Sequence, residues 1–417
     1  MSINLNKVSA NNIINALRSG IVPQEGLSYL TTGNDKEIEE LTNELDYISE
    51  GNTAIRFIQG DYGSGKTFLS YKLADNALNE GYAVSTVVIS LTNILSNLSN
   101  IYKSIVDGLK VKGKTEGTAL IDILDKWSFN QFNKTKKIES SSSKYHDDNN
   151  FLITLSKNIE HSLISTQNIN PVFAKCVMAY ATSKIKKDSD KARLAISWLK
   201  GIDSISNSEY KSELGIKGKI DSKDILSFLK GLVYLIVDSG YKGLVLIFDE
   251  IETIQRLQIR KQRQDSYEII RMIIDEVGVN AYKNTLFIMT GTPQFFEDKK
   301  FGIPSYPALY DRISSPTKVI GDSIKQPILK LKRLDENLLL KISKKIIDLY
   351  KTAYSCDGLL NITDDNIMDF IKVLSENFGE INSKPREYIR RFIKLIDLKL
   401  EFPESSIYSF INSPIEL

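Results

Sequence analysis

The chain has 417 residues, of which 42% are hydrophobic and 25% are charged, enough for about two or three domains with a sizeable core. Lysine and arginine total 54 against 52 for aspartate and glutamate, so no overall positive charge points to nucleic acid, although a local basic patch is compatible with this balance. The two cysteines and two histidines lack metal-ligand spacing, which argues against a zinc site. No segment approaches about 18 apolar residues, so we expect a cytoplasmic protein that does not enter a membrane.

The first elements along the chain are predicted to be helices. One covers residues 8–18 and ends at Ser19-Gly20, and residues 21–23 follow as an extended connector. Another covers residues 36–45, where apolar side chains recur at helical spacing. A short buried strand is then predicted over residues 54–59.

The segment after this strand is Gly60-Asp61-Tyr62-Gly63-Ser64-Gly65-Lys66-Thr67, which matches the phosphate-binding loop pattern G-x-x-x-x-G-K-[ST] at every fixed position. Glycines let backbone N–H groups surround phosphate oxygens, and a helix predicted over residues 67–79 presents its positive end to them. We assign residues 60–67 and Phe68 to nucleotide binding, with Lys66 at the β- and γ-phosphates and the Thr67 hydroxyl on Mg²⁺. A chance glycine-rich turn is the alternative, and the strand and helix on either side argue against it.

A long insertion then interrupts the alternation of strands and helices. Residues 82–90 are predicted to form the second strand, and from about residue 91 to residue 242 the pattern becomes mainly helical. Within the insertion, residues 133–150 are polar and low in complexity, which predicts a mobile loop. Residues 185–193 mix positive and negative charges, so we interpret them as a solvated helix face.

The strand pattern resumes at Leu244-Val245-Leu246-Ile247-Phe248, which is followed by two carboxylates, Asp249 and Glu250. A buried charge at the end of a strand is costly unless a nearby Mg²⁺ ion or ordered water satisfies it. We therefore expect Asp249 to hold the Mg²⁺ shell and Glu250 to polarise the attacking water. A strand that simply runs into an acidic helix start is the alternative, and the phosphate-binding loop upstream argues against it.

A further buried strand, residues 285–290, ends at Gly291-Thr292-Pro293. A polar side chain at this strand end can report the presence of the γ-phosphate, and we favour Thr290 for this role, with Thr292 close behind. A hydroxyl that serves only the turn is the open alternative, because threonine commonly makes such local bonds. Arg312 is a candidate finger that reaches the nucleotide of a neighbouring subunit, against the stronger alternative of a surface salt bridge.

The last part of the chain is predicted to contain an edge strand, residues 328–332, followed by helices. The final helix opens at Lys384-Pro385, and Arg386 and Arg390 lie one turn apart on it, facing either the nucleotide or water. We divide the chain into residues 1–325, a P-loop ATPase core with the insertion at about 91–242, and residues 326–417, the last core strand and a C-terminal helical lid.

The order of these parts resembles the AAA+ class of P-loop ATPases, closest to the branch that includes origin-recognition and signalling ATPases. More narrowly, the chain is similar over about residues 18–395 to the ATP-binding proteins associated with BREX-type bacterial phage defence. The segments that carry this likeness are RSGIVP at residues 18–23, GDYGSGKT at 60–67, GYKG at 240–243, DEIE at 249–252, and GTP at 291–293 with FF at 295–296.

The resemblance implies a fold, a chemistry and a setting. The implied fold is an α/β AAA+ type P-loop NTPase with a parallel five-stranded sheet and helices on both faces. The implied chemistry is ATP and Mg²⁺ binding, with Arg386 as the nucleotide sensor of the lid and Arg312 as the intersubunit finger. The implied setting is a multi-protein defence system whose other proteins are partners.

The chain departs from the related ATPases in two places. Residues 33–37 lack the arginine of their glycine-arginine box, and too little chain follows the lid for a full winged-helix domain. Several ATPase families place adenine against a helix just before the first strand, here residues 36–45, although an acidic surface helix explains the same residues.

We hypothesise that the chain is an ATP-hydrolysing switch or assembly factor in an antiviral complex on DNA. DNA contact is then direct or through partners. A nucleotide-dependent homo-oligomer would place Arg312 at an interface, whereas a monomer with and without nucleotide is the open alternative. The alternative is a nucleotide-bound module that scaffolds partners with little or no hydrolysis and uses the insertion as its docking surface. A self-sufficient helicase is not expected, because a second RecA-like domain does not fit in the remaining helical sequence.

Overall fold

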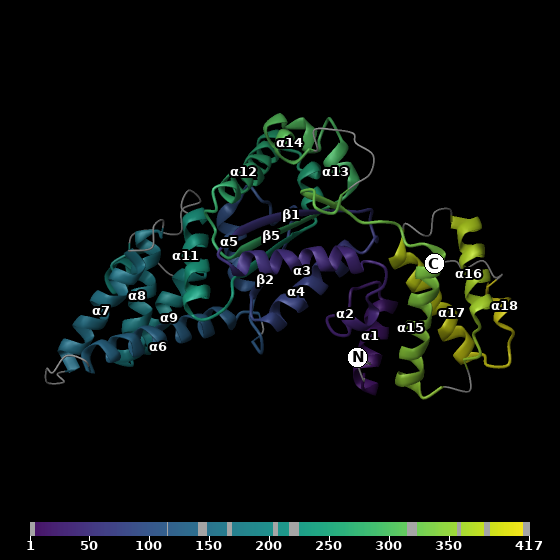
Figure 1. Cartoon of the computed structure of the whole chain (residues 1–417), viewed down its shortest axis with the longest axis horizontal. Coiled ribbons are helices and arrows are strands. Elements are labelled where there is room, and N and C mark those ends of the chain that lie inside the picture. The colour runs from purple at the N-terminus through teal and green to yellow at the C-terminus, as the bar shows by residue number, and fades with distance from the viewer. Residues whose placement is uncertain are drawn as a thin grey trace.

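The computed structural model describes residues 5–114, 116–140, 148–164, 169–202, 207–216, 225–314, 323–356, 360–378 and 384–411. It is an α/β structure, mostly helical, in which a central sheet lies between the helices of the insertion and a smaller helical lid (Figure 1). Within these residues, no helix is both long enough and apolar enough to span a lipid bilayer.

The central sheet of the described residues has six strands in the order β3-β2-β4-β5-β1-β6. Neighbouring strands run parallel from β2 to β6, whereas β3 pairs antiparallel to β2. The expected five-stranded, purely parallel sheet is therefore wrong in strand count and in kind. The strands are β1 (Thr53–Gln59), β2 (Ala83–Val88), β3 (Leu109–Lys110), β4 (Leu244–Asp249), β5 (Thr285–Gly291) and β6 (Ile328–Lys330).

The additional strand, β3, comes from the insertion. It has two residues, which pair Lys110 with Val84 and Leu109 with Ser85, and it covers the edge of β2 that a five-stranded sheet would leave open. So short a strand leaves no periodic pattern in the sequence, because the strand signal needs about four residues of alternation or more.

The sheet is buried on both faces, as parallel sheets generally are. Every residue of β4 and β5 is buried. One face is covered by α3 (Asp35–Ser49) and α4 (Lys66–Glu80), which supply leucines at positions 41, 45, 69 and 73. The other face is covered by α5 (Leu98–Asp107), α11 (Ile225–Asp238) and α12 (Arg260–Gly278).

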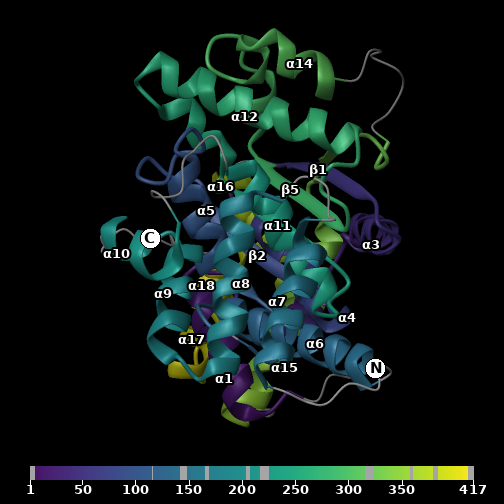
Figure 2. The ribbon, with the colours of Figure 1, turned by 90° about the vertical axis from the view of Figure 1, so that its left-hand side faces the viewer.

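The insertion between β2 and β4 packs directly onto the sheet. Its apolar residues, such as Trp127 and Phe228, form one continuous core with Phe248 and Met289 of the sheet. Figure 2 shows the molecule from the side on which the helices of the insertion lie. Besides α5, β3 and α11, the insertion holds α6 (Ala119–Ser140), α7 (Asp148–Ile164), α8 (Pro171–Lys186), α9 (Ser189–Leu199) and α10 (Asn207–Leu214).

The polar segment over residues 133–150 differs from its prediction. Residues 133–140 continue α6, and residues 148–150 begin α7, so the predicted loop is wrong for both stretches. Residues 141–147 lie outside the described residues. Polar side chains are compatible with a helix wherever one side of it faces water, and composition alone does not distinguish such a helix from a loop.

The lid combines elements from both halves of the sequence. α1 (Lys7–Arg18) packs against α15 (Glu336–Tyr354) and α17 (Pro385–Glu401), and these helices share one core with α16 (Asp364–Phe378) and α18 (Ile407–Ile411) (Figure 1). Arg18 Nε donates to Asp397 Oδ2 at 2.9 Å across the α1–α17 contact. The division at residue 325 stays a prediction, but α1, assigned to the core by that division, packs with the lid.

Candidate functional site

A cavity lies between the carboxyl edge of the sheet and the lid. Its loop end consists of Tyr62–Phe68 with Asp249, Glu250 and Glu252. Its lid end is mostly apolar and combines the connector after α1 with the lid helices. The lining residues of the lid end are Leu17, Gly20, Ile21, Val22, Leu30, Thr32, Asn34, Leu334, Ile342, Pro385, Arg386 and Ile389.

The Gly60–Thr67 loop has a backbone that its glycines make possible. Gly63 and Gly65 have positive φ angles of 78° and 102°. A Cβ atom at Gly60 would lie 2.4 Å from Ser64 Oγ, so a larger residue there would displace the loop. Helix α4 begins directly after Gly65 and has no side-chain cap, which leaves the N–H groups of its first turn available to an anion.

Lys66 is held over this loop. The residue is 7% exposed, and its Nζ donates to the carbonyl oxygens of Gly60 at 2.7 Å and Asp61 at 3.1 Å. Burial lowers the pKa of Lys66, while the carboxylates of Glu252 and Asp249 act in the opposite direction. A phosphate oxygen can replace the two carbonyl acceptors, because an anion is the stronger partner for an ammonium group.

The two predicted metal ligands are in contact. The Thr67 hydroxyl donates to Asp249 Oδ2 at 3.1 Å, and the residue Asp249 is 4% exposed. No described cluster of three His, Cys, Asp or Glu residues forms a metal cage. This pair nevertheless fits Mg²⁺, which proteins usually bind through one or two carboxylates while phosphates and waters complete the shell.

Thr290 is hydrogen-bonded to Asp249 as well. Its hydroxyl donates to Asp249 Oδ1, and the Glu250 backbone N–H lies 3.2 Å from Thr290 Oγ1 and 3.1 Å from Asp249 Oδ1. Thr292 is buried at the start of α13 (Pro293–Glu297) and makes no side-chain capping bond. Neither threonine lines the cavity, so the contact of Thr290 with Asp249 is what distinguishes the two sensor candidates.

Glu250 and Glu252 face the cavity in different environments. Glu250 is exposed and has a positive φ of 59°, a backbone conformation that residues other than glycine seldom adopt. Glu252, in η2 (Ile251–Arg256), is 3% exposed, and neither of its carboxylate oxygens has a hydrogen-bond partner in the described residues. Burial raises the pKa of Glu252, while its own backbone N–H and, to a smaller extent, the Lys66 ammonium act in the opposite direction.

Sequence reasoning missed Glu252 as a site residue. The signal was present in the DEIE segment, whose second glutamate follows Asp249 by three positions. The strand ends at Asp249, and the left-handed backbone at Glu250 turns the chain directly into η2, so Glu252 lies in the first turn of η2, close to the strand end.

The lid reaches the loop through Arg386. Its backbone N–H donates to the Gly63 carbonyl at 3.3 Å, and its side chain lines the cavity. Arg390 does not line the cavity; its side chain packs beside Gly20, where an added Cβ atom would lie 2.9 Å from Arg390 Cδ. Of the two arginines predicted to face the nucleotide or water, Arg386 is therefore the one at the cavity.

The helix predicted beside adenine does not line the cavity. Residues 36–45 belong to α3, which packs on the sheet through Leu41 and Leu45. The connector between α1 and α3 lines the cavity instead, with Ile21 and Val22 at the lid end. An apolar end of this kind suits the flat face of a nucleotide base.

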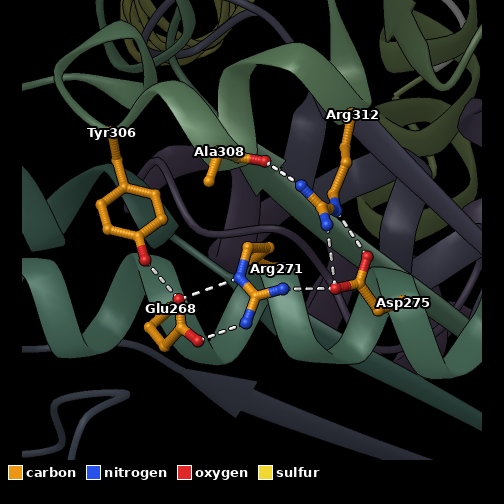
Figure 3. Close-up of polar contacts among 6 residues, drawn as sticks. All are labelled: Glu268, Arg271, Asp275, Tyr306, Ala308 and Arg312. Atoms are coloured by element: carbon orange, nitrogen blue, oxygen red, sulfur yellow. Dashed lines mark hydrogen bonds and ion pairs between the residues drawn. The ribbon is translucent and has the colours of Figure 1, made fainter.

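Arg312 lies outside the cavity, on α14 (Pro307–Ile313), as Figure 3 shows. Its guanidinium bonds Asp275 of α12, with Nη2 and Oδ2 3.1 Å apart, and also donates to the Ala308 carbonyl. Arg271 bonds both Asp275 and Glu268, and its hydrogen bond holds the pKa of Glu268 down to about 2. Within one chain, Arg312 therefore forms a salt bridge, which was the alternative to its role as an intersubunit finger.

Strand ends, loop and lid together define an α/β protein with a cavity suited to a phosphate-bearing ligand at one end and an apolar group at the other. The family model described as BREX system ATP-binding protein BrxC/D matches residues 5–414, nearly the whole chain. The chain therefore belongs to this family of ATP-binding proteins of the BREX defence system. No curated protein matches the chain.

Proposed function

We propose that the chain is an AAA+ type ATPase that binds MgATP and acts as a nucleotide-dependent switch or assembly factor in a BREX complex on DNA. The contact between Thr67 and Asp249 beside the Gly60–Thr67 loop carries this proposal, because it joins a metal-binding pair to a phosphate-binding backbone. Family membership supports the nucleotide as ATP.

The residues have distinct roles in this proposal. The loop amides and Lys66 hold the phosphates, and Thr67 and Asp249 hold Mg²⁺, which when bound offsets charge on the phosphates. Glu250 accepts a proton from the attacking water, which its exposed carboxylate at the cavity can approach. Thr290 fixes the rotamer of Asp249 and links it to the end of β5.

The switch operates through the lid. Arg386 contacts the loop through its backbone and lines the cavity through its side chain, so a change at the phosphates reaches α17 directly. In an oligomer, Arg312 would exchange Asp275 for the nucleotide of a neighbouring subunit. That exchange makes assembly dependent on nucleotide, because only a bound phosphate compensates for the broken ion pair.

We expect light scattering to show a larger molar mass in the presence of Mg²⁺ and a nonhydrolysable ATP analogue than without nucleotide. Lys66→Ala should abolish this change and weaken analogue binding about 100-fold, because charge-assisted hydrogen bonds to phosphate are lost. Lys36→Ala, at an exposed position of α3, is the matched control. A wild-type mass that is the same with and without the analogue would contradict the assembly role.

A second candidate function is a scaffold that holds nucleotide with little or no hydrolysis. It is favoured by exposed apolar side chains on the insertion: Phe129 and Ile138 on α6 are 63% and 58% exposed, and Ile153 on α7 is 53% exposed. Exposed large apolar residues are common contact points for partner proteins. The rate of ATP hydrolysis by wild type separates the two functions, because the first requires turnover and the scaffold requires little or none.

Direct contact with DNA is proposed at the end of η2 and the start of α12. Arg256, Arg260 and Lys261 are exposed, and none of them forms an ion pair within the described part of the chain. Arg256 bonds the hydroxyl of Tyr62 at 2.6 Å, which connects this cluster to the Gly60–Thr67 loop. Unpaired cations beside the nucleotide site can hold a phosphate backbone and respond to the loop.

Replacing Arg260 and Lys261 together by glutamine is expected to weaken binding to a short DNA duplex and to reduce the slope of log affinity against log salt by about 2, since two phosphate contacts are lost. Fluorescence anisotropy over a salt series measures this slope. The double variant Lys103→Gln with Lys175→Gln removes the same charge from exposed positions on α5 and α8 and should match wild type. Equal slopes for all three proteins would place any DNA contact elsewhere.

A further inference from the structure

Glu252 is a buried carboxylate that the described residues leave unsatisfied. It is 3% exposed, and both oxygens lack a hydrogen-bond partner. Burying an ionised carboxylate without a partner is strongly unfavourable, and proteins normally pair such a group. Glu252 lines a ligand cavity, so its missing hydrogen-bond partner can be supplied by a bound ligand.

The position of Glu252 indicates which ligand group is concerned. It lines the loop end of the cavity together with Lys66, Asp249 and Glu250. Among the carboxylates that raise the pKa of Lys66 against the effect of burial, Glu252 raises it most, ahead of Asp249. The Lys66 ammonium itself donates to the carbonyls of the loop and makes no hydrogen bond to Glu252.

The charges at the loop end are unfavourable for a bare nucleotide. Three carboxylates line this end, at positions 249, 250 and 252, against the ammonium of Lys66 and the Arg386 guanidinium that lines the cavity from the lid. A metal-free triphosphate adds further negative charge, which a buried carboxylate repels with little screening. A hydrated divalent cation reverses this balance, because its charge is positive and its waters donate hydrogen bonds to carboxylate oxygens.

We infer that Glu252 is an outer-sphere ligand of a hydrated divalent cation and that it makes nucleotide binding conditional on that cation. The inference rests on the proposed function, since it requires a nucleotide in the cavity. Glu252 accepts hydrogen bonds from cation-bound water and disfavours triphosphate that arrives without a cation. It acts through the cation and through Lys66, so it is a positioning residue and not a catalytic one.

The test is the affinity for a fluorescent nonhydrolysable ATP analogue, measured with excess Mg²⁺ and again with EDTA. Wild type should bind much more tightly with Mg²⁺. In Glu252→Gln, the ratio of the two affinities should fall by about tenfold or more, chiefly because metal-free binding improves when one buried charge is removed. Glu39→Gln, an exposed carboxylate on α3 outside the cavity, should keep the wild-type ratio.

Thermal unfolding without nucleotide or divalent cation gives an independent readout. Glu252→Gln and Glu252→Met should melt at the wild-type temperature or above it, because each removes an unsatisfied buried charge. A structural role for Glu252 predicts the opposite, a lower melting temperature in both variants.

The outcomes separate this inference from the proposed function. A wild type that binds the analogue under neither condition overturns both. A wild type that binds it while Glu252→Gln keeps the wild-type affinity ratio overturns the inference alone, as does a lower melting temperature or a failure to fold in both Glu252 variants.

Discussion

Glu250→Gln is expected to lower ATP turnover by about 10² to 10⁴-fold while ATP affinity stays near that of wild type. The magnitude is that of losing a positioned general base, and glutamine keeps the size and hydrogen-bonding reach of glutamate without accepting a proton. Glutamine also bears the same backbone strain at φ 59°, so the fold should not change. Steady-state phosphate release and analogue binding measure the two quantities separately.

The control for this substitution is Glu39→Gln, which neutralises an exposed carboxylate on α3 away from the cavity. It should hydrolyse ATP as wild type does. Full turnover in Glu250→Gln would exclude Glu250 as the base. If wild type itself does not hydrolyse ATP, the scaffold function is favoured, and partner binding should then depend on Lys66 and not on Glu250.

Arg56→Ala is expected to reduce the free energy of unfolding by about 3–5 kcal/mol, the usual cost of removing one partner from a buried ion pair. Arg56 on β1 is 7% exposed and pairs with Glu40 at 2.9 Å and Glu44 at 2.6 Å, both on α3. It also donates to the Gln326 carbonyl at 2.6 Å, just before β6. The alanine variant leaves two poorly solvated carboxylates without a counter-charge and frees the chain that precedes β6.

Denaturant unfolding measures this loss. Arg193→Ala is the matched control, because the side chains of its ion pair with Asp190 are 80% and 85% exposed and such pairs contribute about 0–1 kcal/mol. A loss below about 1 kcal/mol for Arg56→Ala would show that the carboxylates find other partners or become protonated.

Local patterns predicted the parts of the site that lie close together in the sequence. The Gly60–Thr67 loop is recognisable because its backbone requires glycine at fixed positions and Lys66 at a fixed distance from them. Asp249 and Glu250 are recognisable because a run of buried apolar residues ends in charge. The predicted family is confirmed, and the proposed roles of these residues in catalysis stay predictions.

The parts that were missed depend on contacts between distant residues. The two-residue strand β3 is defined by its pairing with β2, which its own sequence does not reveal. The partner of Arg312 is Asp275 on another helix, and only the packing of α12 against α14 brings them together. Burial of Glu252 likewise follows from how η2 sits against the sheet, since Glu250, two positions earlier, is exposed.

The packing of α1 within the lid also limits how the lid can move. The lid core is joined to the sheet by two separate stretches of chain, residues 19–34 before α3 and residues 331–335 after β6. Two connections restrict the relative movement of two bodies more than one connection does, because any rotation has to be compatible with both. The Arg386–Gly63 hydrogen bond is a third connection between the lid and the sheet side of the cavity, so a rotation of the lid away from the loop has to break it.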